Sequence, residues 1–384
     1  MRKAELHLAI TCHKNPPADW NDFVMECEPS HFEQTSWWAN VESGDGWIPR
    51  YVVARDMDRI AAGAMVLVRR QSGIGRAGYV FRGPLTCREF SDSEHIRGSL
   101  AVALKDFARE EHLVVLVIVP AYDGTKLANT FFNRGFLRHP SSLPPTSLPR
   151  GKTSIDLRRE PKVIEQGYRR TLQKQINRAR KQGVTVKLGD SGDLEMFWKM
   201  HLELCRRRGV ASNVPGFDYV RRVWYEFQQH ARAWMFNAVL GEDVLCSLIC
   251  LGAGKWFYTW RIGWAPDSEK AYPTQAAFAE AINTAVKVGY QFFDFLGIDP
   301  DEVAIIERGG GLNTPTSGIT FFKMGFGGDI SILPPTLDWF PNPAVRLFMR
   351  CAGLRLFSSR GFKMFARLLT RAEPTNAETR GAGG

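Results

Sequence analysis

The stretches Phe131-Phe-Asn-Arg-Gly-Phe136 and Phe321-Phe-Lys-Met-Gly-Phe326 share four of their six residues at matching positions. They lie 190 positions apart (321 − 131), which indicates an internal duplication. Three further pairs of segments align in the same order at offsets of about 180 to 190: residues 51–68 with 236–251, 78–82 with 256–261, and 113–120 with 292–299. The sequence therefore predicts two domains of similar fold.

Each repeat has the pattern of an α/β domain. Residues 51–68 form two mostly apolar runs around Asp56-Met-Asp58, as the strands and turn of a β-hairpin do. The later run Leu113-Val-Val-Leu-Val-Ile-Val119 is continuously apolar, which is typical of a strand buried on both faces. A proline-rich segment at residues 140–149 separates the repeats. We therefore expect a first domain at 1–150, a second at 151–335, and a separate basic C-terminal segment at 336–384.

The composition narrows the class of protein. The chain has 384 residues, enough for two domains, and a net charge of +10, which favours anionic partners such as nucleic acid, phosphorylated substrates or an acidic membrane surface. Seven cysteines without paired spacing indicate a reducing compartment. Neither a signal-peptide core nor an apolar run of about 20 residues is present, so we predict a cytoplasmic protein that does not span the membrane.

Two segments concentrate positive charge. A predicted helix at residues 164–182 carries Arg170, Lys174 and Arg178, which could bind tRNA or phosphate or form a solvated face. Residues 343–371 carry seven basic and no acidic residues among aromatic and aliphatic ones. That pattern suits a helix on the inner face of an anionic membrane, or one packed on the second domain with its arginines outward. The tail after Glu373 is expected to be disordered.

Lys323 and Asp294 are the candidate catalytic residues. Lys323 lies among Phe321, Phe322 and Phe326, where partial desolvation would strengthen an ammonium as an anion clamp. The alternative is an edge-strand lysine whose ammonium reaches water. Asp294 lies among apolar residues at the end of a predicted buried strand, where it could act on substrate or hold a loop amide.

Four segments resemble the FemABX family: Gln34-Thr-Ser-Trp-Trp-Ala39, the helix end Arg178-Ala-Arg-Lys-Gln-Gly-Val-Thr-Val186, Phe293-Asp-Phe-Leu-Gly-Ile298 and Gly318-Ile-Thr-Phe-Phe-Lys-Met-Gly-Phe-Gly327. The resemblance covers about residues 30 to 330. It implies two tandem GNAT-like acyltransferase domains, each a mixed central sheet flanked by helices. It also implies a monomeric aminoacyltransferase that needs no cofactor and takes an amino acid from aminoacyl-tRNA. The implied acceptor is an amine of a nucleotide- or lipid-linked peptidoglycan precursor, or of a related envelope precursor.

The resemblance also assigns residues. Phe322 and Lys323 match the family's catalytic-site Phe-Lys pair, and Tyr258 lies on its aromatic substrate-contact strand, where Arg261 is a further candidate. Trp37 is either a core residue or a substrate contact. This chain has Glu42 where the family usually has a lysine for the substrate diphosphate, which puts the ordinary nucleotide-linked pose in doubt.

Two other functions remain open. An ordinary GNAT enzyme would use an acyl-CoA or acyl-carrier donor, but the R-x-x-G-x-G pattern at residues 70–75 is followed directly by a predicted strand rather than a helix. The chain could also be a non-catalytic scaffold of envelope biogenesis. The scattered histidines and cysteines give no metal-site spacing, so no metal is expected.

Overall fold

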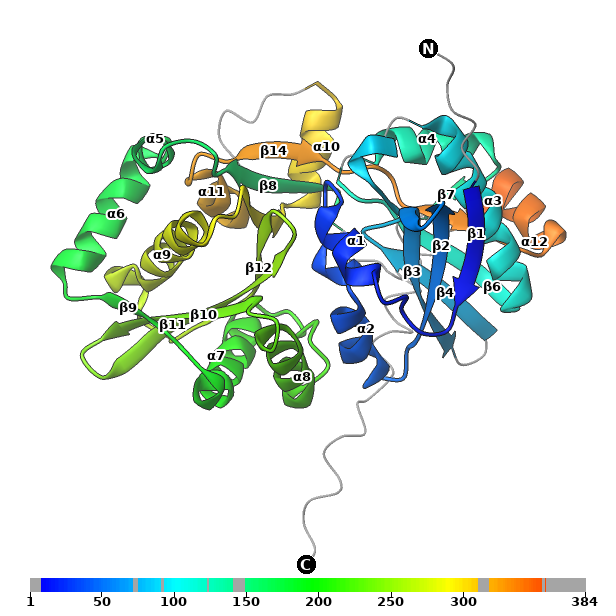
Figure 1. Ribbon diagram of the computed structural model, residues 1–384. Helices are drawn as coiled ribbons and strands as arrows, with labels where there is room; N and C mark the ends of the chain where they lie inside the picture. The colour runs from blue at the N-terminus through cyan, green and yellow to red at the C-terminus, as the bar shows by residue number, and fades with distance from the viewer. Residues whose placement is uncertain are drawn as a thin grey trace, which may run out of the picture.

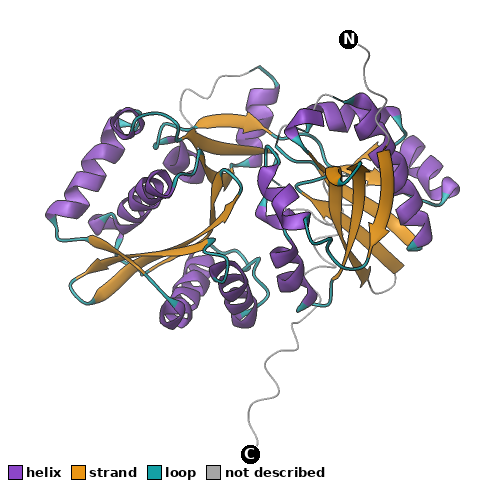
Figure 2. Ribbon diagram, viewed as in Figure 1, coloured by secondary structure: helices purple, strands orange, loops and turns teal. Residues whose placement is uncertain are grey.

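The computed structural model describes residues 8–71, 75–90, 93–122, 124–140, 149–309, 318–353 and 356. Within these residues two mixed β-sheets lie side by side, and helices pack around each of them (Figures 1 and 2). The predicted pair of α/β domains is confirmed, with sheets of eight and seven strands.

The first sheet has the order β1-β2-β3-β4-β6-β15-β7, with β5 paired to β3, and only β4 and β6 run parallel. Its strands are β1 (Leu8–His13), β2 (Ile48–Asp56), β3 (Arg59–Gln71), β4 (Gly75–Phe81), β5 (Leu85–Thr86), β6 (Leu113–Val119), β7 (Leu137–Arg138) and β15 (Leu337–Trp339). Its helices are α1 (Trp20–Glu26), α2 (Ser36–Ser43), α3 (Glu94–Glu110) and α4 (Thr125–Asn133), with 3₁₀ turns at Phe32–Gln34 and Arg88–Phe90. The apolar strand β6 lies inside this sheet, as its sequence predicts.

The second sheet has the order β14-β8-β13-β12-β11-β10-β9, and only β12 and β13 run parallel. Its strands are β8 (Gly151–Asp156), β9 (Thr185–Leu188), β10 (Ala233–Leu240), β11 (Asp243–Ala253), β12 (Trp256–Trp264), β13 (Phe292–Gly297) and β14 (Asp329–Ile332). The helices are α5 (Pro161–Gln166), α6 (Arg170–Lys181), α7 (Leu194–Arg207), α8 (Phe217–Gln228), α9 (Pro273–Val288), α10 (Pro300–Glu307) and α11 (Gly318–Met324), with 3₁₀ turns at Ser191–Asp193 and Glu269–Ala271.

The two strand orders are the same, which supports the predicted duplication. The hairpin β2–β3 corresponds to β10–β11, and the parallel pair β4/β6 corresponds to β12/β13. In each sheet one more strand lies between the parallel strand and the last strand: β15 between β6 and β7, and β8 between β13 and β14. The last strand of each sheet follows the repeated Phe-Phe-x-x-Gly-Phe motif at the end of α4 or α11.

Strand β15 corrects the expected domain organisation. It falls in the range 336–384, which the sequence places outside both domains, yet it pairs with β6 and β7 of the first sheet. The following helix α12 (Pro343–Phe348) and the π-helical turn Met349–Gly353 therefore begin at the first domain. Arg346 of α12 lies over the Trp339 ring at 4.2 Å, so α12 packs on the first domain rather than the second. The basic residues predicted beyond position 356 lie outside the described residues.

Two helices also differ from expectation. The helix predicted at 164–182 is interrupted, because α5 ends at Gln166 and α6 begins at Arg170. Lys323 lies on the short helix α11 and not on an edge strand. This helix spans residues 318–324 and buries Thr320. Strand β3 ends at Gln71 and β4 begins at Gly75, so a strand and not a helix follows the 70–75 pattern, as the strand-to-strand interpretation predicts. Residues 72–74 lie outside the described residues.

The two domains share a hydrophobic core. Phe32 of the first domain packs edge-on against Tyr258 at 5.3 Å and Phe227 at 6.2 Å, both from the second domain. Between α2 and α8, Tyr219 donates a hydrogen bond to Glu42 at 2.7 Å, and burial raises the pKa of Glu42 to about 7. Glu42, at the position where the resemblance implies a lysine, is thus a contact between the domains in this chain.

Candidate active site

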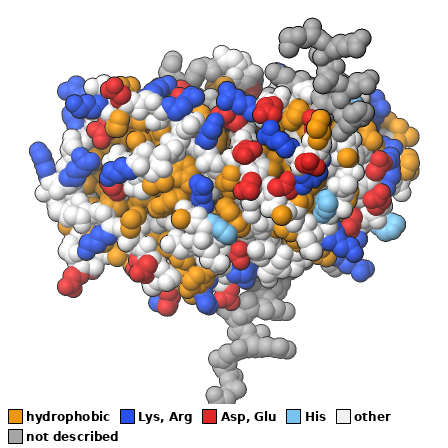
Figure 3. Space-filling model, viewed as in Figure 1, with side chains coloured by type: hydrophobic (Ala, Val, Ile, Leu, Met, Phe, Trp, Pro, Cys, Tyr) orange, Lys and Arg blue, Asp and Glu red, His pale blue; other side chains and the backbone are white. Residues whose placement is uncertain are grey.

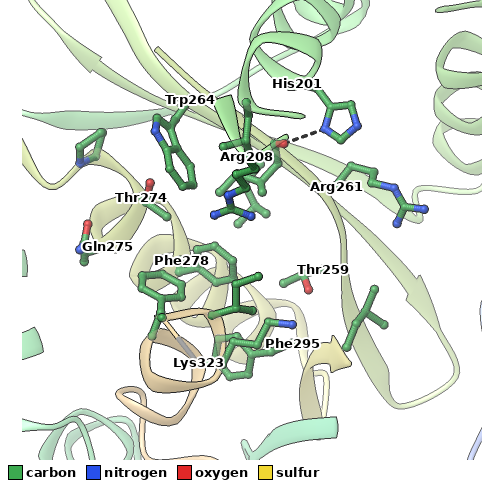
Figure 4. Close-up of a pocket in the computed structure, with 18 of the residues that line it drawn as sticks. His201, Arg208, Thr259, Arg261, Trp264, Thr274, Gln275, Phe278, Phe295 and Lys323 are labelled. Carbon is green, nitrogen blue, oxygen red and sulfur yellow. Dashed lines mark hydrogen bonds between the residues drawn. The ribbon is translucent and has the colours of Figure 1, made fainter. Parts of the chain in front are cut away.

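A cavity of about 760 Å³ lies in the second domain, between α7, β12, α9 and α11 (Figure 4). Its walls are mainly aromatic and aliphatic: Leu204, Leu248, Ile262, Trp264, Phe278, Phe295 and Phe322. Its charged lining residues include Arg208, Arg261 and Lys323. On the face shown in Figure 3, hydrophobic side chains gather over the middle of the second domain, with Lys and Arg side chains around them. Such a cavity suits a ligand with an apolar body and a polar reacting group.

The strands of the second sheet create this cavity. β12 and β13 pair in parallel only from Trp256/Phe292 to Tyr258/Asp294 and then separate. At the same point the register between β11 and β12 shifts, with Ile249 opposite Arg261 and Cys250 opposite Thr259. Trp260 is therefore the extra residue of a β-bulge, which bends β12 and leaves the ladder locally open. Ligands commonly bind at the carboxyl ends of such diverging strands.

Lys323 lies in the wall of the cavity, as a catalytic role requires. Its ammonium donates a hydrogen bond to the carbonyl of Gly297, and Figure 4 shows its nitrogen directed toward Thr259. Burial lowers the pKa of Lys323 to about 8, Asp294 opposes that shift, and Arg208 adds to it. The ammonium is thus partly desolvated but still available near neutral pH. This geometry is compatible with stabilising a developing oxyanion.

Asp294 is fully buried and bound to a residue that the sequence interpretation missed. Its carboxylate accepts a hydrogen bond from Lys152 Nζ at 2.8 Å and another from the Leu296 amide at 2.6 Å. The Lys152 ammonium also lies 3.5 Å from the Tyr122 ring centroid and 3.8 Å from that of Trp256. Asp294 is not among the residues that line the cavity. It therefore acts on the site indirectly, by holding β13 and by its charge near Lys323.

The other proposed substrate contacts divide into two groups. Phe322 and Arg261 line the cavity. Tyr258 is fully buried and donates a hydrogen bond to the carbonyl of Ser30 in the first domain, so the prediction that it contacts substrate does not fit its position. Trp37 stacks on His230 at 4.2 Å between the domains, which fits the core alternative better than a substrate contact.

Two buried donors of the cavity wall have no hydrogen-bond partner among the described residues. They are the indole nitrogen of Trp264 and Nε of Arg261. A buried donor that is left unpaired costs free energy, and a bound ligand with acceptor oxygens would satisfy it. This is a further indication that the cavity is a binding site.

Comparison with known proteins matches each half of the chain to a family. Residues 16–130 match the FemAB family, and residues 166–302 match the acetyltransferase (GNAT) domain. The crystal structure of FemX superposes with a TM-score of 0.74 at 15% identity, over 89% of this chain and 99% of that one. The first domain thus matches the FemAB family by sequence, and the predicted resemblance to the FemABX family is confirmed.

Other structures share the fold of this protein at lower similarity. The structure of L-PGS from Bacillus licheniformis has a TM-score of 0.52 at 12% identity, over 90% of this chain and 97% of that one. A conserved protein of unknown function from Bacteroides thetaiotaomicron has a TM-score of 0.54 at 10% identity, over 86% and 99% of the two chains. No curated protein matches the sequence. The predicted fold, two tandem GNAT-like domains, is confirmed, and the protein is an acyltransferase.

The basic residues predicted to bind tRNA or phosphate lie on one helix. Arg170, Lys174 and Arg178 are exposed on α6, which packs beside α9. The guanidinium of Arg178 lies 5.7 Å from the ring centroid of Tyr272, and Tyr272 lines the cavity. The basic face of α6 therefore reaches the cavity rim.

The described residues contain neither a metal site nor a membrane-spanning helix. No group of three His, Cys, Asp or Glu side chains in them could hold a metal ion. None of their helices is long and apolar enough to cross a membrane.

The sequence interpretation missed two kinds of residue. Lys152 lies in a strand without a recognisable motif, and only the fold brings it to Asp294. His201 and Cys205 of α7 also line the cavity. Their spacing of four residues places them on one face of a helix, which is the one sequence signal that could have paired them.

Proposed function

We propose that this protein is an aminoacyltransferase, which moves an amino acid from aminoacyl-tRNA to an amine of a peptidoglycan precursor or a related envelope precursor. The observation that supports it most directly is the desolvated ammonium of Lys323 in a cavity large enough for an acyl group, in a chain that resembles the FemABX family. In this reaction the acceptor amine attacks the ester carbonyl of the donor. The Lys323 ammonium stabilises the oxyanion that develops on the carbonyl oxygen.

The donor is assigned from the charge around the cavity. A tRNA acceptor end is a polyanion, and α6 presents Arg170, Lys174 and Arg178 to solvent. Arg178 lies next to Tyr272, which lines the cavity. In our proposal the basic face of α6 holds the phosphates while the aminoacyl ester enters the cavity. The apolar walls then exclude water from the ester.

The acceptor and its location are assigned from the C-terminal segment. The helix α12 exposes Val345, Leu347 and Phe348 next to Arg346, a mixture that suits the surface of an anionic membrane. In our proposal the protein works as a peripheral protein at the inner face of the cell membrane. A lipid-linked acceptor would be found there.

Transfer from a mixture of radiolabelled aminoacyl-tRNAs tests this function. Purified protein is incubated with the mixture and with either nucleotide-linked or lipid-linked peptidoglycan precursor, and the products are identified by mass spectrometry. We expect one precursor to gain the mass of one amino acid, and to gain nothing with the Lys323→Ala variant. If neither precursor is modified while a muropeptide analysis of a deletion strain is also unchanged, the proposed acceptor class is wrong.

A second candidate is an N-acyltransferase that uses acyl-CoA or an acyl-carrier protein. The observation in its favour is that α9 begins at the cavity, where Thr274 and Gln275 lie in its first turn and line the wall. A helix N-terminus provides free amides that bind phosphate. Product mass separates the two candidates, because an added acyl group lacks the amino group of an added amino acid.

A further inference from the structure

Three side chains that no function above uses meet at the α7 side of the cavity. Nε2 of His201 lies 3.7 Å from Sγ of Cys205 and 3.3 Å from Oγ of Ser212. Nδ1 of His201 lies 2.9 Å from the carbonyl oxygen of Ile262 on β12, the contact drawn as a dashed line in Figure 4. Cys205 and His201 both line the cavity.

The hydrogen bond to Ile262 determines where the imidazole proton lies. A carbonyl oxygen can only accept, so Nδ1 carries the proton and donates it to Ile262. In the neutral ring Nε2 is then unprotonated and faces the Cys205 thiol. The Ser212 hydroxyl has one hydrogen, and it can donate a hydrogen bond to the carbonyl oxygen of Val214 at 3.2 Å.

The surroundings keep His201 neutral. Its side chain is buried, stacks on Trp198 at 5.8 Å, and lies parallel to Phe197 at 6.0 Å. Burial lowers the pKa of His201, the hydrogen bond to Ile262 opposes that shift, and Arg261 adds to it. A neutral imidazole within reach of a thiol is the arrangement of a general base and its nucleophile, with the Ile262 carbonyl as the orienting group.

One unpaired hydrogen-bond donor lies on the same strand. Ile262 is two residues beyond Trp260, the extra residue of the β-bulge in β12. Arg261 lies between them, and its buried Nε has no hydrogen-bond partner in the part of the chain that the structure describes. Residues 260–262 thus bring three features together in the cavity wall: the carbonyl that orients His201, an unpaired donor and the locally open strand ladder.

We propose that Cys205 is a nucleophile activated by His201, and that it can hold the acyl group as a thioester on its way to the acceptor. The inference rests on the acyl-transfer chemistry of the proposed function. It replaces the direct attack of the amine on the donor ester with two attacks, first by Cys205 and then by the amine. Nothing in the family match or in the superposed structures assigns this pair of residues.

The step balances without an oxidant or a reductant. As Sγ of Cys205 attacks the acyl carbonyl carbon, its proton passes to Nε2 of His201, a C–S bond forms, and the donor C–O bond breaks. The proton on Nε2 then passes to the leaving oxygen. In the second half the acceptor amine attacks the thioester carbonyl, a C–N bond forms, the C–S bond breaks, and the proton lost by the amine returns to the thiolate through His201.

The reactivity of Cys205 can be tested on the intact chain with iodoacetamide, read residue by residue by peptide mass spectrometry. Cys351 is an exposed thiol and serves as the internal reference. We expect Cys205, although it is partly buried, to be alkylated about tenfold faster than Cys351 at pH 7, because His201 takes the thiol proton. Alkylation of Cys205 no faster than that of Cys351 would overturn the proposal.

Two variants separate activation from mere exposure. His201→Gln retains a donor for Ile262 but has no base for the thiol, so the rate advantage of Cys205 should disappear while the melting temperature changes little. Ser212→Ala removes the competing hydroxyl and is the matched control, in which the advantage should persist or increase. Equal rates in the wild type and His201→Gln would contradict the role of the imidazole.

An activated ester tests the covalent step itself. After brief incubation with p-nitrophenyl acetate and an acid quench, we expect an acetyl adduct on Cys205 that neutral hydroxylamine removes and that Cys205→Ala lacks. This readout needs neither tRNA nor an envelope precursor. If no adduct forms but transfer from aminoacyl-tRNA proceeds, the thioester is refuted and the proposed function stands. If an adduct forms but no such transfer occurs, the proposed donor is refuted and Cys205 remains a nucleophile.

Discussion

At the scale of single residues, Lys323 yields a prediction about rate and pH. If its ammonium stabilises charge only in the transition state, Lys323→Ala should lower turnover by about 10² to 10³ with little change in stability. Lys323→Arg keeps the charge on a larger planar group and should restore activity in part. Single-turnover transfer and thermal melts on the two variants measure both effects, and a fully active Lys323→Ala protein would exclude a catalytic role.

The pH dependence follows from the lowered pKa of Lys323, about 8 in the folded protein. The ammonium loses its proton as pH rises through that value, so catalysis by the charged form should fall above it. An arginine at 323 stays protonated, because its pKa exceeds about 12. The ratio of wild-type to Lys323→Arg rates should therefore fall above about pH 8, a comparison that cancels titration of the acceptor amine. A ratio that rises instead would indicate that the neutral amine is the active form.

The buried pair of Lys152 and Asp294 yields a prediction about stability. Both side chains are almost completely buried, and Lys152→Met would leave the Asp294 carboxylate without its cation. We expect a loss of about 3 to 5 kcal/mol in the free energy of unfolding, measured by urea denaturation. In the double variant Lys152→Met, Asp294→Asn the amide can still accept from Leu296, so much of the loss should be recovered. If the double variant is no more stable than Lys152→Met alone, the unpaired charge is not the cause.

At the scale of elements, α6 yields a prediction about tRNA binding. Replacing Arg170, Lys174 and Arg178 with Gln removes three exposed charges from one helix face. Each lost phosphate contact should reduce the slope of log K against log salt by about 0.7 to 0.9, so a total reduction of about 2 is expected. Gln substitutions at the exposed residues Lys14, Lys126 and Lys199 on other elements are the matched control. An equal loss in both triple variants would show that only net charge matters.

At the scale of the whole molecule, strand β15 makes the end of the chain part of the first domain, because it pairs with β6 and β7. A chain ending at residue 342 retains β15, while one ending at residue 335 leaves the facing edges of β6 and β7 unpaired. We expect the 1–342 chain to melt close to the full chain and the 1–335 chain to lose the cooperative unfolding of the first domain. Calorimetry of the three chains measures this, and similar melts of the two truncated chains would show that β15 contributes little.

The same 1–342 chain tests membrane binding. Without residues 343–384 it should no longer sediment with anionic vesicles, while binding of the full chain should weaken as salt is raised, because part of the attraction is electrostatic. Neutral vesicles provide the control for the electrostatic part. Equal binding of the full and truncated chains would place the membrane contact elsewhere.

The sequence by itself determined the features that depend on local or repeated patterns. The duplicated Phe-Phe-x-x-Gly-Phe motif predicted two similar domains, and the apolar run at residues 113–119 predicted a buried strand. The aromatic setting of Lys323 left two alternatives, a desolvated ammonium and an edge-strand lysine that reaches water. These features are readable because the period of a strand, a helix or a repeat is contained in the order of neighbouring residues.

Only the tertiary structure decided which distant residues meet. Three of these contacts leave no local pattern in the sequence. They are the pairing of β15 with the first sheet, that of Lys152 with Asp294 across 142 positions, and the contact of His201 with Ile262 across 61 positions. Sheet pairing and burial bring these groups together, because a backbone edge must find a partner and a buried charge or imidazole must find a hydrogen bond. Neither requirement specifies from the sequence which distant residue will meet it.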